Sequence, residues 1–387
     1  MTDIFERLVQ HRRELHKIPE TAFSEFKTGD YLREVISGLS SFRIENMART
    51  GLIAVYEYGG QDDFIAFRTD IDGLKIREET GLDFASVHEG FMHACGHDLH
   101  MSIMLTFAEY IERSKPKKNI LLIFQPAEEG FGGGEMMVKE GLFEKYRTTE
   151  AYAVHNTVEF PVGTVALNDG KMFAGTIEFE YNLSGKGGHA AVPHQNNDLV
   201  TASTFLVNLV NTIEPRFLDP LKENVISIGM IHAGEAANIL PSSAIIKGTA
   251  RSYYEDDLAR IKEKLKDAGN SVSIAFGIKA KLIIHSEYIP AINHKSIAEK
   301  VKRTDFGKGI TVTDCEKKMT GEDFGFMIRK IPGAIAWLGA GNDVNTSFGL
   351  HHQSYNPDEK AMMVGFLYFS KLLENFNSKT ESINGRP

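Results

Sequence analysis

Side chains that bind metals in proteins recur at several separate points of this sequence. A glycine-containing turn, HACGHDLH at residues 93–100, holds Cys95 and His97 two positions apart. The other candidates are two adjacent glutamates, a histidine that ends an apolar run and a pair of histidines near the C-terminus: Glu128, Glu129, His155, His351 and His352. Thiolate, imidazole and carboxylate groups together suit zinc, manganese, cobalt or nickel rather than magnesium or calcium.

This donor set is large enough for two metal ions. A pair of metals about 3.5–4 Å apart shares a bridging ligand and needs roughly five or six protein donors. A thiol, a carboxylate and several imidazoles supply that number: Cys95, His97, Glu129, His155 and one of His351 or His352. Glu128, directly beside a ligand glutamate, is then expected to take a proton from a water whose pKa the metals lower.

Each of these residues also has an ordinary structural interpretation. A single cysteine is usually a small buried apolar residue, and Cys315, without a histidine or glutamate on a nearby turn, keeps that interpretation. Adjacent glutamates usually face solvent, but Glu128 and Glu129 follow an apolar run and Pro126, and they precede GFGGG. Other histidines are expected to be supporting, packing or surface residues: His93 and His100 beside the turn, His11 and His16 near the N-terminus.

Three short apolar runs are expected to position these side chains. They lie at residues 64–68 (FIAFR), 119–124 (NILLIF) and 151–156 (AYAVHN), and they are typical of strands buried on both faces. Apolar residues at helical spacing over 4–15 and 98–114 predict helices around them. Strands that alternate with helices predict an α/β fold with a mostly parallel sheet.

Polar residues follow these runs directly. Asp70 and Asp72 come after the first run, Gln125 and the adjacent glutamates after the second, and His155 lies at the end of the third. Ligands bind at the carboxyl ends of strands in open α/β sheets. We therefore expect these side chains to meet at one edge of the sheet.

The middle of the chain predicts a separate small domain. Segments with strand and helix character follow one another as 176–185 (strand), 199–213 (helix), 225–231 and 244–253 (strands), 257–268 (helix) and 279–287 (strand). This βαββαβ order is the split βαβ, ferredoxin-like arrangement, with two helices on one side of a four-stranded sheet. A strand at 334–341 and a helix at 359–376 then resume the earlier pattern. We expect an α/β domain of residues 1–172 and 288–387, interrupted by an α+β insert of residues 173–287.

The composition is that of an enzyme-sized globular protein. Among 387 residues, 43 are lysine or arginine and 52 are aspartate or glutamate, which gives a net charge of −9. This balance is unsuited to nucleic acid or an anionic membrane, and no stretch approaches the roughly 18 apolar residues of a membrane span. The N-terminus lacks a signal-peptide core, and two cysteines are too few for a disulfide framework. We expect a cytoplasmic enzyme.

Several motifs together resemble those of one known family. They are RRELHKIPE, HACGHDLH, QPAEEG, VHN, GKGGHAAVPH, NILP, GTAR, GEDF and LHH with NPDE, in order from residue 12 to residue 359. The chain resembles the metal-dependent amidohydrolases that include hippurate hydrolase, N-acyl-amino-acid aminoacylases and plant auxin-conjugate hydrolases. The resemblance implies a catalytic domain with two divalent metal ions and an inserted lid domain that also dimerises. It implies a homodimer or tetramer that acts on a small N-acyl amino acid.

The resemblance also implies a role for each matching residue. Five positions match the family's metal ligands: Cys95, His97, Glu129, His155 and His351. Glu128 matches the general base, and Asp70 matches the acid that orients a metal ligand. In the insert, His189 matches a histidine that reaches a neighbouring protomer's site and steadies the oxyanion. Asn238 and Arg251 match residues that hold the substrate's carboxylate.

Within this family the details resemble the branch that removes the acetyl group from N-acetyl-LL-diaminopimelate in bacterial lysine biosynthesis. The supporting motifs are MHACGHDLHM, QPAEEGFGGGEMM, MTGEDFG and GLHHQSYNPDE, although HHQ departs from the commoner form, in which a small residue and proline follow LH. The same chemistry would serve hippurate-like or other N-acyl amino acids, or a dipeptide. A metal-stabilised binding protein is disfavoured, because binding alone has no need of Glu128.

Overall fold

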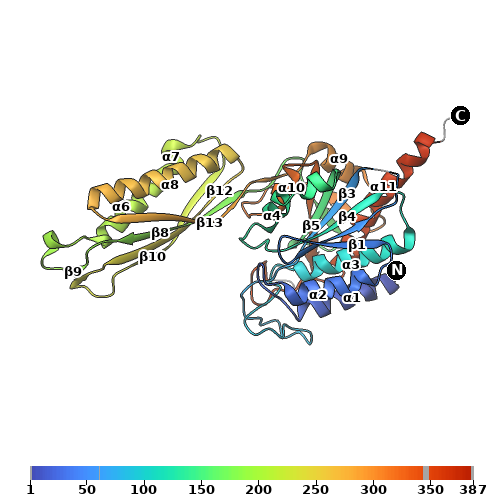
Figure 1. The fold of residues 1–387 in the computed structure, drawn as a ribbon, viewed down its shortest axis with the longest axis horizontal. Coiled ribbons are helices and arrows are strands. Elements are labelled where there is room, and N and C mark those ends of the chain that lie inside the picture. Colours follow the sequence, from blue (N-terminus) through green and yellow to red (C-terminus); the bar gives the residue numbers. More distant parts are fainter. Residues whose placement is uncertain (1, 61, 343–347, 385–387) are drawn as a thin grey trace. The chain divides into compact units, whose positions relative to one another are not determined.

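The computed structural model describes residues 2–60, 62–342 and 348–384 of the chain (Figure 1). Helices and strands alternate over most of this length, as the α/β prediction requires. None of the helices in this described part combines the length and the apolar character needed to cross a membrane.

The chain divides into two compact units. The larger contains Met1–Met172, Ile292–Glu316 and Asp323–Pro387, and the smaller contains Phe173–Ala291 and Lys317–Glu322. The smaller unit extends past residue 287 because its last strand continues to residue 288. The segment at 317–322 belongs to it because Ala174 N donates to the carbonyls of Lys318 and Thr320.

An eight-stranded sheet forms the centre of the larger unit, in the order β1-β2-β4-β3-β5-β16-β6-β15. Its central strands are parallel: β4 (Asn119–Gln125), β3 (Phe64–Asp70), β5 (Thr148–Pro161) and β16 (Gly333–Gly341). The three predicted apolar runs form β3, β4 and β5, and every residue of β3 and β4 is buried. The remaining strands are partly antiparallel: β1 (Phe42–Met47), β2 (Gly51–Tyr56), β6 (Thr164–Ala166) and β15 (Thr311–Thr313).

Helices cover both faces of this sheet. They include α1 (Thr2–His16), α2 (Phe26–Ser37), α3 (His97–Ser114), α4 (Gly133–Lys139), α10 (Phe324–Ile328) and α11 (Ala361–Asn384). On one face, Phe67 of β3 packs edge-on against Phe107 of α3 and Phe369 of α11, and α1 and α2 share this core. Successive strand residues point to opposite faces. Arg68 therefore points to the other face, where it contacts Asp323 at the start of α10, which packs against α4 (Figure 1).

The smaller unit contains the predicted four-stranded sheet with helices on one side. Its main elements are β8 (Gly175–Ser184), α6 (Leu199–Asn211), β10 (Asn224–Ala233), β12 (Ser243–Ser252), α8 (Glu255–Phe276) and β13 (Lys279–Tyr288). The strand order is β10-β12-β8-β13, and each neighbouring pair is antiparallel. Leu206 of α6 and Leu265 of α8 share one core with Phe179 and Tyr181 of β8, so both helices cover the same face. A short ribbon continues from one end of this sheet, where β9 (Gly188–His189) pairs with β11 (Ile239–Leu240) (Figure 1).

Candidate metal centre

The parallel strands bring three polar side chains to one edge of the larger unit. Asp70 at the end of β3 lies opposite Gln125 at the end of β4. Arg68 of β3 pairs with Ala153 of β5, so Asp70, two residues later, is level with His155. The register of the sheet therefore accounts for the meeting of Asp70 and His155, as the parallel arrangement predicts.

The HACGHDLH turn enters this edge at the N-terminus of α3. His97 is the first residue of the helix, and Gly96 before it has a φ of +80°. A Cβ atom at Gly96 would lie 2.4 Å from Nδ2 of Asn156. Both the backbone conformation and the packing therefore require glycine at this position, and the turn fixes the directions of Cys95 and His97.

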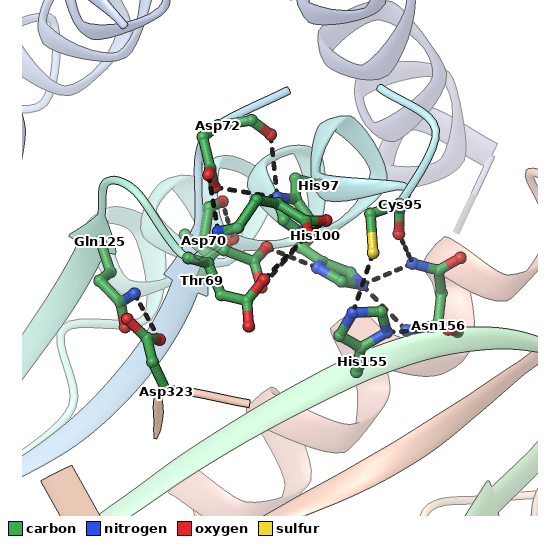
Figure 2. A network of polar contacts seen from close by, with 12 residues as sticks. Thr69, Asp70, Asp72, Cys95, His97, His100, Gln125, His155, Asn156 and Asp323 are labelled. Carbon is green, nitrogen blue, oxygen red and sulfur yellow. Dashed lines mark hydrogen bonds and ion pairs between the residues drawn. The ribbon is translucent and has the colours of Figure 1, made fainter. Parts of the chain in front are cut away.

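The five predicted ligands lie together in the structure. Cys95 Sγ is 3.4 Å from His155 Nε2, and the donor atoms of Cys95, His97 and His155 lie within 4.8 Å of one another (Figure 2). Glu129 Oε1 is 3.1 Å from His351 Nε2 and 4.0 Å from His97 Nε2. Cys95, Glu129 and His351 form a second group within the same 4.8 Å limit. Residues from four separate parts of the larger unit thus converge on one cluster.

Two further carboxylates border this cluster. Glu128 Oε2 lies 4.0 Å and Asp70 Oδ2 lies 3.8 Å from His97 Nε2. That ring nitrogen is buried and has no hydrogen-bond partner among the residues that the structure describes. An unsatisfied imidazole nitrogen facing several carboxylates is the arrangement expected around a cation.

In two of these histidines, the ring nitrogen that faces away from the cluster is hydrogen-bonded to the protein. His97 Nδ1 lies 2.9 Å from the carbonyl oxygen of Asp72 and 3.2 Å from its Oδ1 (Figure 2). His155 Nδ1 donates to the carbonyl of Asn156 at 2.9 Å. These contacts place the proton on Nδ1 and leave Nε2 of each ring directed into the cluster. Asp72, rather than Asp70, is therefore the acid that orients the His97 ring.

Asp70 has a different principal partner. Its Oδ1 accepts from His100 Nδ1 at 2.6 Å, and its Oδ2 accepts from Arg68 at 2.9 Å. His100 Nε2 accepts hydrogen bonds from Asn156, from the backbone N at 2.9 Å and from Nδ2 at 2.8 Å. Both ring nitrogens of His100 are thus engaged by protein groups, so His100 supports the site, as expected, and is not a ligand.

The chemistry of the cluster fits divalent cations. Burial, followed by the charges of Glu129 and Glu128, raises the pKa of Cys95 well above its ordinary value. A thiolate would add negative charge where carboxylates already gather, and a bound cation reverses this balance because it deprotonates a coordinating thiol. Sulfur, imidazole and carboxylate donors suit zinc, manganese, cobalt or nickel.

The three candidate residues of the smaller unit are not all neighbours. His189 pairs with Ile239, and Ala190 N donates to the carbonyl of Asn238 at 3.0 Å, so His189 and Asn238 lie on the same exposed ribbon. Arg251 lies at the far end of β12, where it pairs with Thr176. The ribbon adjoins the opposite end of that strand, about 27 Å away at 3.4 Å per residue.

Sequence reasoning missed the polar contacts of the first helix. His11 and His16 are both buried, as packing residues would be, but each makes polar contacts. His11 Nδ1 lies 2.8 Å from the Tyr31 hydroxyl, and His16 Nδ1 lies 2.8 Å from Asp98 Oδ2. The RRELHKIPE motif could have indicated a structural role for His16, because it places this residue in a stretch that resembles the metal-dependent amidohydrolases. Cys315 lies near Met172, with 3.8 Å between the sulfurs, and contributes nothing to the cluster.

Comparisons with known proteins agree with this geometry. The profile of peptidase family M20/M25/M40 matches residues 66–375. An N-acetyldiaminopimelate deacetylase of Bacillus subtilis (strain 168) is 42% identical over 359 residues, which cover 92% of this chain and 95% of that enzyme. The enzyme of the same name from Streptococcus sanguinis (strain SK36) is 39% identical over 370 residues, covering 94% and 97%.

Solved structures extend this similarity to the fold. A Bacillus subtilis protein described as a dinuclear metal binding peptidase from the M20 family superposes with a TM-score of 0.78. It is 27% identical to this chain, and the match covers 97% of this chain and 99% of that one. Since the family profile spans most of the sequence and near-full-length relatives share 39–42% of their residues with it, this chain belongs to peptidase family M20/M25/M40.

Proposed function

We propose that this chain is a metal-dependent amide hydrolase that converts N-acetyl-LL-diaminopimelate and water to LL-diaminopimelate and acetate, in cytoplasmic lysine biosynthesis. The substrate is supported by the curated relatives named N-acetyldiaminopimelate deacetylase, which match over almost their whole length. The chemistry is supported by one observation above all. The carboxyl group of Glu128 lies 4.0 Å from Nε2 of His97, a proposed ligand, at the border of a cluster that fits divalent cations.

Two divalent ions would be held by one thiol, one carboxylate and three imidazoles, from Cys95, Glu129, His97, His155 and His351. When bound, such ions lower the pKa of a water molecule and polarise the substrate carbonyl. Zinc, manganese, cobalt and nickel all suit these donors. Asp72 would keep the His97 imidazole oriented, and Asp70 would hold His100, which supports the cluster from outside.

The protein's own side chains would then perform the proton transfers and the binding. Glu128 accepts a proton from the attacking water and delivers it to the leaving amine nitrogen, so that the amide becomes acetate and a free amine. His189 donates to the carbonyl oxygen as negative charge develops there. Arg251 of one chain and Asn238 of its partner chain bind the substrate's carboxylate, for which the planar guanidinium offers a fork of donors.

The smaller unit is proposed to dimerise the protein, as a homodimer or as a tetramer. Its edge strand β10 exposes Val225, Met230 and Ile231, which are 39%, 41% and 51% accessible. An exposed apolar edge strand invites pairing with another chain. Within one chain, Arg251 and His189 are separated by the length of β12, so one small substrate cannot contact both. A second chain would allow a substrate to contact Arg251 of one chain and His189 of the other.

Replacing the proposed base tests the chemistry. In Glu128→Gln we expect the metal content to equal that of the wild type, because the proposed ligands are intact. The value of kcat should fall by about 100-fold or more, since general base catalysis contributes that much. Turnover at the wild-type rate would exclude Glu128 as the base.

Substrate comparison tests the specificity. We expect kcat/KM for N-acetyl-LL-diaminopimelate to exceed the values for N-acetyl-methionine and hippurate, which represent the other acyl amino acid hydrolases. Equal values would favour a general aminoacylase. A metal chelator should abolish hydrolysis and added metal should restore it. A preparation that binds metal but hydrolyses none of these amides would instead be a binding protein.

A further inference from the structure

The turn that carries Glu128 has an unusual backbone. Ala127, immediately before the base, has a φ of +54°, in the left-handed region that residues with a side chain rarely adopt. The turn is also tightly packed, because a Cβ atom at Gly133 would lie 1.7 Å from the carbonyl oxygen of Pro126. Ala127 lies beyond the end of β4 at Gln125, so its N–H needs an acceptor outside the sheet.

That acceptor is Glu25, a residue 102 positions away at the start of α2. Glu25 is fully buried, its Oε1 accepts from Ala127 N at 2.9 Å, and its Oε2 accepts from Thr50 Oγ1 at 2.6 Å. Glu25 occupies the N-cap position of α2, yet its side chain makes no capping hydrogen bond to that helix. The carboxyl group therefore serves the turn rather than the helix on which it lies.

A second carboxylate holds the turn on the other side of the base. Asp72 Oδ2 accepts from Glu129 N at 3.0 Å, while Asp72 Oδ1 lies 3.2 Å from His97 Nδ1. The peptide N–H groups before and after Glu128 are thus each fixed by a carboxyl group. Asp72, just after β3, lies next to the metal cluster, whereas Glu25, at the start of α2, lies outside it.

We propose that Glu25 is a positioning residue for the reaction, which holds Ala127 in the left-handed conformation and thereby aims the side chain of Glu128. This inference rests on the proposed role of Glu128 as the base. Burying a carboxyl group is unfavourable unless it is hydrogen-bonded, and here both oxygens are satisfied by the turn and by Thr50. Burial, followed by the charge of Asp72, raises the pKa of Glu25 to about 7, so a neutral side chain of the same shape fits the site.

Three variants separate positioning from simple stabilisation. Glu25→Gln keeps an oxygen for Ala127 N and an amide for Thr50, so its kcat should remain within about threefold of wild type. Glu25→Asp keeps the carboxyl group but is one methylene shorter, and Glu25→Ala removes the acceptor. Both should lose kcat by about tenfold or more, with KM and metal content within about twofold, since misorientation of a base affects the chemical step.

Glu20 provides a matched control on the same loop. Its Oε2 accepts from Thr28 N at 3.0 Å, so Glu20→Ala removes a comparable contact from carboxylate to backbone, directed at α2. We expect its kcat to be unchanged. A kcat for Glu25→Asp and Glu25→Ala equal to that of Glu20→Ala would overturn the proposal, as would a Glu25→Gln variant as slow as Glu25→Asp.

Amide hydrogen exchange distinguishes this inference from the proposed function. In Glu25→Ala and Glu25→Asp, a peptide covering residues 125–130 should exchange faster than in wild type, whether or not the enzyme hydrolyses the tested amide. Unchanged exchange would show that Glu25 does not hold the turn. If exchange is faster in the variants but the wild type hydrolyses none of the tested amides, the contact between Glu25 and the turn is supported and the proposed function is rejected.

Discussion

Asn156 links two parts of the metal cluster through its backbone and side chain. Its Nδ2 donates to the carbonyl of Cys95 at 2.8 Å and to His100 Nε2 at 2.8 Å (Figure 2). Its Oδ1 accepts from the Tyr355 hydroxyl, and its carbonyl accepts from His155 Nδ1. Displacement of the Asn156 side chain would therefore remove a hydrogen bond that holds the turn of one proposed ligand, Cys95.

Gly96→Ala should weaken metal binding through this asparagine. Alanine at a φ of +80° would cost on the order of 1–2 kcal/mol, and its Cβ would lie 2.4 Å from Asn156 Nδ2. Because residues behind the ligands typically contribute about 10- to 100-fold to metal affinity, we expect a loss of that size. Competition with a chromogenic chelator measures it.

Gly90 offers a closely matched control for this substitution. Its φ is +81°, but a Cβ atom there would meet no atom within 4 Å. Gly90→Ala should therefore lower the free energy of unfolding by a similar amount and leave metal affinity unchanged. If the two alanine variants lose metal affinity equally, the contact with Asn156 does not support the cluster.

At the scale of elements, a buried ionic group joins α1 to the start of α3. His16 of α1 lies 2.8 Å from Asp98 and 3.2 Å from Glu78, and Arg12 lies 3.2 Å from Asp98. Asp98 directly follows His97, so this group fixes the helix end that carries a proposed ligand. Burial alone would lower the pKa of His16, but the Asp98 and Glu78 carboxylates raise it from 6.5 to about 9.

The charge of His16 predicts a pH dependence of stability. Since the folded state raises this pKa, the stabilisation is fully present below pH 6.5 and is lost as the pH rises through about 9. The contribution is on the order of 3 kcal/mol at about 1.4 kcal/mol per unit of pKa. We expect the difference in free energy of unfolding between wild type and His16→Gln to be largest at pH 6 and to shrink by pH 9.5, in urea titrations.

The exposed His194 supplies the control for that series. His194→Gln should change the free energy of unfolding little, because this exposed side chain forms no buried ion pair. A difference for His16→Gln that does not decrease with pH would mean that His16 is not stabilised as a cation.

The central strands could be predicted from the sequence, because a strand that is buried on both faces requires a continuous apolar run. The run at 119–124 became β4 with every residue buried. The ribbon formed by β9 and β11 could not be predicted, since each strand has two residues and depends on its partner. The predicted helix 257–268 continues to Phe276, because Val272 still faces the core and Gly277, at a φ of +65°, ends it.

The clustering of the proposed metal ligands could be predicted from their residue types and their places in the sequence, but the contacts behind them could not. Asp72 and His97 are 25 positions apart, and Asn156 and Cys95 are 61 apart. Neither pair belongs to a periodic pattern, and each depends on how a strand end meets a turn. Glu25 was missed for the same reason, since its partner Ala127 is 102 positions away.

At the scale of the whole molecule, the proposed site residues are distributed over the two units of the chain. Glu128 and the proposed metal ligands belong to the larger unit, and His189 and Arg251 belong to the smaller. Arg251 lies near one end of β12 and His189 lies on the ribbon beyond the other end, so one chain cannot supply both to the same small substrate. A dimer in which one protomer provides His189 to a site of its partner satisfies this constraint.

Mixing two inactive variants tests that arrangement. In a mixed dimer of His189→Ala and Glu128→Gln, one site combines an intact Glu128 with the His189 of the other chain, and the second site lacks both. Random exchange of subunits makes half of the dimers mixed, so activity should recover to about a quarter of wild type. Subunits that are refolded separately and then combined without exchange should remain inactive. If mixing with exchange also restores no activity, although mixed dimers are detected by mass spectrometry, His189 acts within its own chain and the shared site is excluded.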